Sequence, residues 1–124
     1  MEQLLLHLIG DYLIQTDWMA KNKTSNIWIA TIHSAVYSLP FLLLSPSMFA
    51  LAVIFVTHVA MDRYRLARFV VFAKNKLTEP GLQWCDACKT GFHKDTPPWL
   101  AVWLLIIADN TLHLTINYAS LRWL

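Results

Sequence analysis

The stretch HLIGDYLIQTD, residues 7–17, places a histidine, two aspartates and a glutamine inside an apolar run that extends from Leu4 to Ala20. An ionisable group at the centre of a membrane helix costs roughly 2.5–3.5 kcal/mol on insertion scales, and such groups normally face a bundle interior or a wet cavity. Leucine would pack the helix without that cost. The stretch therefore predicts a helical bundle organised around a buried polar site, with His7 and Asp11 pointing inward.

Composition places the chain in the membrane class. Of its 124 residues, 56% are hydrophobic and 15% are charged, whereas a soluble domain carries about 25% charged residues. A membrane span needs about 20 residues, and the apolar runs predict helices at about 4–20, 27–44, 48–72 and 98–121. We predict an all-α integral membrane bundle of four transmembrane helices that forms a single domain, 1–124.

Two of these helices are expected to be irregular. Pro40 should kink the second helix or mark its fraying outer end. The third run becomes polar at Asp62, so its last part, up to residue 72, is predicted to be an amphipathic extension whose arginines reach toward lipid headgroups. A polar cytoplasmic loop at about 74–97 follows. The first run lacks a positive n-region after Met1, and we expect it to belong to the mature protein.

The basic residues indicate how the chain crosses the membrane. Nine of the ten lysines and arginines lie between the first and second apolar runs or between Met61, where the third apolar run ends, and the fourth run; only Arg122 lies elsewhere. By the positive-inside rule, those segments are cytoplasmic and both termini are external. We therefore expect a multi-pass protein of the bacterial inner (cytoplasmic) membrane whose partner is lipid and not nucleic acid. Four short helices enclose little volume, which is compatible with a homo-oligomer.

Four of the five histidines fall inside the predicted helices, and three of them have an aspartate four residues away. Residues at this spacing share one helix face. The pairs are His7 with Asp11, His58 with Asp62, and His113 with Asp109, while His33 is the single histidine of the second helix. The repetition on separate helices predicts that these side chains meet in the bundle.

Neutral imidazoles and carboxylates suit transition metals better than calcium. We predict one or two divalent ions (Zn, Mn or Fe) with ligands drawn from His7, Asp11, His33, His58, Asp62, Asp109 and His113. Asp11 or Asp109 is the candidate catalytic base, and Gln15, Asp17 and Arg65 are candidates for contacts to ligands or substrate. Two other interpretations remain open: hydrogen-bonded polar packing between helices, and a proton or ion pathway. Asp62 could also simply pair with Arg65.

The polar loop contains a second group of candidate ligands. Cys85 and Cys88 form a CxxC pair that is followed by His93. This is half of a zinc site, which Asp95 or a second chain could complete. The alternative is a pair of reduced thiols without a special role, since the predicted cytoplasmic side argues against a disulfide.

The opening pattern HxxxDxxxQ, formed by His7, Asp11 and Gln15, resembles the hallmark of a family of small bacterial and phage membrane proteins of unknown function. The histidine of the second helix, the HVAMD of helix three and the DNTLH of helix four extend the resemblance over nearly the whole chain. The cysteine pair departs from the family. The pattern is also broadly similar to small membrane-bound metal-dependent hydrolases, a likeness of architecture more than of motif.

These observations lead to two functional hypotheses. The first is a metal-dependent hydrolase that activates water at an intramembrane His/Asp site and acts on a lipid or lipid-linked phosphoester. The second is a non-enzymatic protein, either a metal or proton conductor or a phage or host envelope interaction module. Residues 37–44 and 48–56 are nearly free of ionisable groups, which favours a site open on one side over a path through the membrane.

Overall fold

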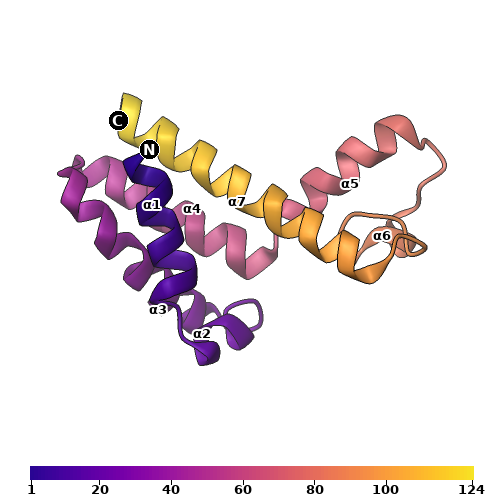
Figure 1. The fold of residues 1–124 in the computed structure, drawn as a ribbon, viewed down its shortest axis with the longest axis horizontal. Helices are drawn as coiled ribbons and strands as arrows, with labels where there is room; N and C mark the ends of the chain where they lie inside the picture. The colour runs from indigo at the N-terminus through magenta and orange to yellow at the C-terminus, as the bar shows by residue number, and fades with distance from the viewer. The chain divides into compact units, whose positions relative to one another are not determined.

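The computed structural model describes residues 1–124, and its regular structure is entirely helical. In chain order the elements are α1 (Glu2–Leu8), the π-helix η1 (Ile9–Leu13), α2 (Asp17–Asn22), α3 (Ile27–Ser38), the 3₁₀-helix η2 (Leu39–Leu44), α4 (Met48–Tyr64), α5 (Ala67–Thr78), α6 (Trp84–Ala87) and α7 (Pro98–Trp123). They form two compact units (Figure 1). Unit 1 comprises Met1–Tyr64 and His113–Leu124, and unit 2 comprises Arg65–Leu112.

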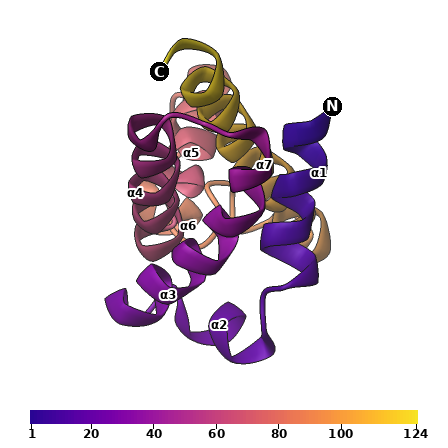
Figure 2. The same ribbon diagram turned by 90° about the vertical axis from the view of Figure 1, so that its left-hand side faces the viewer.

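Within unit 1, α3 lies between the α1–η1 segment and α4 (Figure 2). The chain reverses between η2 and α4 at Ser45, whose left-handed φ of 49° ends the preceding helix. Ser47 then accepts a hydrogen bond from the Ala50 amide at 3.0 Å and donates one to the Leu124 carbonyl at 3.0 Å. This turn therefore fixes both the start of α4 and the C-terminal end of the chain.

An apolar cluster fills unit 1 toward this turn. Its fully packed members are Leu6, Tyr37, Phe41 and Ile54, with Leu44, Leu51 and Leu121 against them. Burial of each such side chain contributes about 1.5–3 kcal/mol relative to leaving it exposed. Along α3 and α4, the polar residues His33, His58 and Asp62 lie further from this turn in the chain than the cluster members Tyr37 and Ile54.

The first and third predicted helices are interrupted in the structure. The run 4–20 divides after η1, because Thr16 is extended and its hydroxyl accepts a hydrogen bond from the Met19 amide, which starts α2 as a new helix. The continuous extension predicted up to residue 72 is wrong, since Arg65 takes a left-handed φ of 53° and separates α4 from α5. The predicted irregularity at Pro40 is confirmed, because the α-helix gives way to the 3₁₀-helix η2 there.

Two helical segments, 27–44 and 98–123, are long and apolar enough to cross a membrane. They indicate membrane association weakly, because a buried core helix can pass the same test. The structure does not support four spans. The first predicted span is divided into short helices, and α4 has 17 residues.

In unit 2 the polar loop is held against α5 by close packing. The Arg68 guanidinium lies over the rings of Phe69 and Trp84 and donates a 3.0 Å hydrogen bond to the Cys88 carbonyl. Gly91 has a φ of 83°, and an added Cβ there would lie 2.4 Å from the Arg68 carbonyl oxygen. Only glycine fits this approach, so Gly91 is the residue that lets the loop lie against α5.

Candidate metal centre

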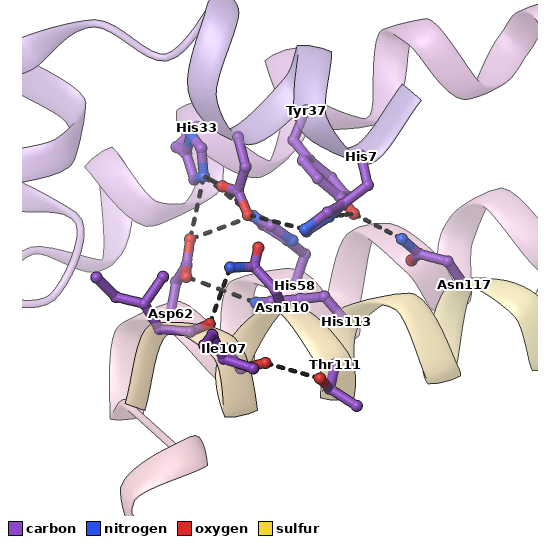
Figure 3. Close-up of polar contacts among 12 residues, drawn as sticks. His7, His33, Tyr37, His58, Asp62, Ile107, Asn110, Thr111, His113 and Asn117 are labelled. Carbon is purple, nitrogen blue, oxygen red and sulfur yellow. Dashed lines mark hydrogen bonds and ion pairs between the residues drawn. The ribbon is translucent and has the colours of Figure 1, made fainter. Parts of the chain in front are cut away.

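Four of the predicted ligands converge in unit 1. They are Asp11 on η1, His33 on α3, and His58 and Asp62 on α4, and all four are buried. The Nε2 atom of His33 is at the middle of the group: it lies 3.1 Å from Asp11 Oδ1, 3.1 Å from Asp62 Oδ2 and 3.0 Å from His58 Nε2. Figure 3 shows His33, His58 and Asp62 pointing toward one another.

The spacing of these atoms fits the shell of a metal ion. Zinc bonds to nitrogen and oxygen of about 2.0–2.2 Å place neighbouring ligand atoms of a tetrahedron roughly 3.3–3.6 Å apart. The remaining distances from His58 Nε2 are 3.2 Å to Asp62 Oδ2 and 3.7 Å to Asp11 Oδ1. All four donor atoms lie within 4.8 Å of one another, so the group could hold a metal ion.

One feature departs from typical metal sites. A ligating histidine usually donates its second ring N–H to a carboxylate, carbonyl or water, which fixes the ring. The Nδ1 atoms of His33 and His58 are buried and have no hydrogen-bond partner. The His58 ring is oriented by packing instead, because Tyr37 stacks on it with ring centroids 3.6 Å apart.

The π-helix η1 brings Asp11 to the group. A single π-helical turn of this kind is rare and frequently occurs at functional sites. Gly10 permits it to approach α3, because a Cβ at this position would lie 2.6 Å from the Tyr37 ring. A glycine and a local change of helix type thus place the Asp11 carboxylate beside His33.

His7 and His113 flank the four ligands in the same unit. His7 lies 3.9 Å from the Asp11 carboxylate through Nε2, and its Nδ1 is 2.8 Å from the Tyr37 hydroxyl. His113 Nε2 is 3.8 Å from Asp62 Oδ1, and its ring centroid is 4.3 Å from that of His58. Six of the seven predicted ligands are therefore gathered in unit 1. The seventh, Asp109, belongs to unit 2, one helical turn before His113 on α7.

Lys23 is a member of this group that the sequence reasoning missed. Its ammonium nitrogen lies 2.9 Å from Asp62 Oδ2, 3.5 Å from Asp11 Oδ1 and 3.2 Å from His33 Nε2. The side chain is only 15% exposed. In the sequence, this lysine contributes only to the charge pattern that predicts membrane orientation. No local pattern links it to Asp11, 12 positions before it, or to Asp62, 39 positions after it.

Tyr37 and Asn117 were also missed, although a signal for them existed. The Asn117 amide donates a 2.6 Å hydrogen bond to the Tyr37 hydroxyl, which in turn bonds His7. Tyr37 follows His33 by four residues, and Asn117 follows His113 by four. Each intrahelical histidine therefore has a polar residue one turn further on, and a search not limited to carboxylates would have found both.

The predicted auxiliary residues lie in different environments. Gln15 is half-buried, and its Oε1 atom is buried without a hydrogen-bond partner. Asp17 is not part of the group: its side chain is 79% exposed and pairs with Lys21 at 2.7 Å, because it begins the separate helix α2. Arg65 belongs to unit 2, where it is exposed and donates to the Lys89 carbonyl at 3.1 Å.

In unit 2, Cys85, Cys88 and His93 line one cavity of about 630 Å³. They do not converge as metal ligands do, and both cysteines are free thiols. His93 pairs instead with its neighbour Asp95 at 3.2 Å, and Lys94 pairs with Asp86 at 2.8 Å. The Lys94 ammonium holds the pKa of the Asp86 carboxyl below its usual range.

The fold and the site together define an all-helical protein with a buried His/Asp group of metal-ligand spacing. The chain belongs to the family described as "Protein of unknown function (DUF3307)", which matches residues 1–120. That description names no activity. No curated protein and no solved structure matches the chain.

Proposed function

We propose that this protein is a membrane-embedded metalloprotein that acts as a metal-dependent hydrolase. The observation that carries the proposal is that Asp11, His33, His58 and Asp62, from three helical segments, bring one ligand atom each into a single group. Neutral imidazoles and carboxylates favour zinc, manganese or iron over calcium. Polar packing alone requires partners in pairs, whereas here four donor atoms all lie within 4.8 Å of one another.

The exposed apolar surface supports a membrane location. On α7, side chains such as Trp99, Trp103 and Ile107 are more than half exposed, and Trp28, Leu39 and Leu43 are equally open on segment 27–44. An apolar surface of this kind is costly in water and suits lipid. We place Lys21 and Lys23 on the cytoplasmic side and the turn at 45–47 outside, with α4 following α3 back because the two helices pack together.

Hydrolysis is the chemistry that such a site supports. A divalent metal lowers the pKa of a bound water so that it becomes a nucleophile near neutral pH. Asp11 accepts the proton of that water when its carboxylate is not fully used as a ligand. Because the site would be reached from the bilayer or its cytoplasmic face, the proposed substrate is a lipid or lipid-linked phosphoester.

A proton pathway is the second candidate, and one observation favours it. Asn117, Tyr37 and His7 form consecutive hydrogen bonds of 2.6 Å and 2.8 Å that lead from α7 toward Asp11. A conductor needs such polar groups to continue to the outer face. The apolar cluster of Leu6, Phe41 and Ile54 fills that side of unit 1, which favours a site with one entrance.

The metal content of the purified protein tests the proposal. The protein is purified in detergent without chelator, loaded with zinc, manganese or iron(II), desalted and measured by elemental analysis. We expect bound metal in the wild type, loss of most of it in His33→Ala and His58→Ala, and no change in His93→Ala, the matched control in unit 2. A wild type that retains no metal after loading overturns the metal site.

Two further assays separate the candidate functions. Release of phosphate or alcohol from lipid phosphoesters, abolished in Asp11→Asn, supports hydrolysis. Proton flux in proteoliposomes, abolished in His7→Ala without a requirement for metal, supports the pathway instead. Cysteine labelling at position 46 tests the orientation, which is reversed if the label reacts only from the cytoplasmic side.

A further inference from the structure

The Lys23 ammonium lies against the group of candidate metal ligands. Its ammonium lies within 3.5 Å of three of the four candidate ligand atoms, those of Asp11, His33 and Asp62. The buried carboxylates of Asp11 and Asp62 have oxygen atoms within 4.8 Å of each other, and without a cation they would repel each other strongly. The lysine supplies that positive charge within the protein itself.

The backbone around Lys23 is built to deliver this side chain. Lys23 is the C-cap residue that follows α2, and its amide donates to the Met19 carbonyl at 2.9 Å. The next residue is tied down from another helix, because Arg63 at the end of α4 donates a 2.8 Å hydrogen bond to the Thr24 carbonyl. The segment between the break at 14–16 and the start of α3 therefore holds Lys23 over the site from one side.

Lys21 provides an internal comparison. It lies two residues earlier, in the last turn of α2, yet its side chain is 70% exposed and pairs with the exposed Asp17. Both lysines satisfy the same topology rule, so membrane orientation does not account for the burial of Lys23. Burying its ammonium costs free energy that only the pairing with the aspartates offsets.

We propose that Lys23 is a resident counter-cation that competes with the divalent metal, so that metal binding expels its side chain from the site. This inference rests on the proposed metal site and adds its regulation. A divalent ion and an ammonium carry charge of the same sign, and both need the same oxygen atoms of Asp62 and Asp11. In the metal-free protein Lys23 closes the site. In the metal-bound protein its side chain lies outside the ligand group, at the cytoplasmic mouth.

Metal affinity in four proteins tests the competition: wild type, Lys23→Met, Lys23→Arg and Lys21→Met. Binding of Zn²⁺ and Mn²⁺ is measured by calorimetry in detergent with a buffered metal supply. In Lys23→Met no ammonium has to be displaced from Asp62 and Asp11, so binding should tighten at least about tenfold. Lys23→Arg keeps the charge and should bind close to the wild-type affinity, as should Lys21→Met, which leaves the site untouched.

A second readout uses the wild type and does not depend on the folding of a variant. Amine labelling followed by mass spectrometry should show Lys23 protected without metal and at least about fivefold more reactive with saturating Zn²⁺, because a buried ammonium is poorly accessible. Lys21 should react equally in both states. Unchanged Lys23 labelling, or an affinity of Lys23→Met equal to or weaker than that of the wild type, overturns the competition while the metal site stands. If no protein binds metal, both proposals fail.

Discussion

The buried centre of unit 1 and the polar loop of unit 2 contain the same residue types, yet they are built differently. In unit 1, histidine, aspartate and lysine meet around His33, a fully buried side chain. In unit 2, His93 pairs with Asp95 and Lys94 pairs with Asp86, and the lysine and Asp95 side chains are 65% and 80% exposed. Residue type alone therefore does not identify a site.

Sequence separation explains the contrast. The contacts of unit 1 join residues far apart in the chain: His33 and Asp11 are 22 positions apart, and Tyr37 and Asn117 are 80 apart. The pairs of unit 2 join close neighbours, which can find each other in an unfolded or solvated loop. Bringing distant charged groups together in a buried place costs free energy, because the groups lose their hydration. Ionisable groups held in such an environment are typical of functional sites.

The largest effect should come from deleting a carboxylate in the buried centre, and deleting one in the loop is the control. In Asp62→Ala, the Lys23 ammonium loses its closest carboxylate, at 2.9 Å, and breaking a buried pair costs about 3–5 kcal/mol of unfolding free energy. Asp95→Ala removes an exposed partner and should leave the melting temperature unchanged. Thermal unfolding in detergent measures both. Equal melting temperatures for the two variants would mean that the centre of unit 1 is as solvated as the loop.

A hydroxyl deletion tests the polar network beside the ligands. Tyr37→Phe removes the oxygen that bonds both His7 and Asn117, and we expect a loss of about 1–3 kcal/mol in unfolding free energy. Tyr118→Phe, at an exposed position, is the control and should cost less than about 0.5 kcal/mol. If the metal site depends on this network, Tyr37→Phe also lowers zinc content, which a purely structural role would not do.

Glycine substitutions compare the packing of the two regions. In Gly10→Ala the new Cβ meets the Tyr37 ring at 2.6 Å, and moving a packed ring should cost roughly 1–2 kcal/mol, the lower part of the range for overpacked cores. Gly81→Ala in the loop meets nothing within 4 Å and should be neutral in the same melting assay. A neutral Gly10→Ala would show that η1 can move away from α3, and the placement of Asp11 would then be loose.

Much of the site could be predicted from the sequence. Histidine and aspartate at i and i+4 share a helix face whatever the tertiary fold, which is why His58 and Asp62 were assigned together and lie 3.2 Å apart. The cost of ionisable groups among apolar residues predicted their burial, and His7, His33 and His113 are at most 2% exposed. The length and composition of α7 likewise predicted its bounds within two residues.

What could not be predicted depends on local backbone geometry and long-range placement. The π-helix at residues 9–13 has no composition signal, and the left-handed conformation of Arg65 contradicts the usual preference for glycine or asparagine. Lys23 reaches the site only because the chain breaks at 14–16 and turns back. An amphipathic pattern describes one element at a time, so it identifies neither the break nor its consequence.

The smallest effect, no change in zinc content, is expected for substitution of the two cysteines. Cys85 and Cys88 are free thiols, and their sulfur atoms contact Asp86 and the Cys85 carbonyl at 3.8 Å rather than a common centre. The double variant Cys85→Ser/Cys88→Ser should therefore keep the zinc content of the wild type, whereas His33→Ala should lose it. Because thiolates bind zinc strongly when they converge, retention of zinc by His33→Ala and its loss from the cysteine variant would move the metal centre from unit 1 to unit 2. Measured side by side by elemental analysis, the two variants decide which region binds the ion.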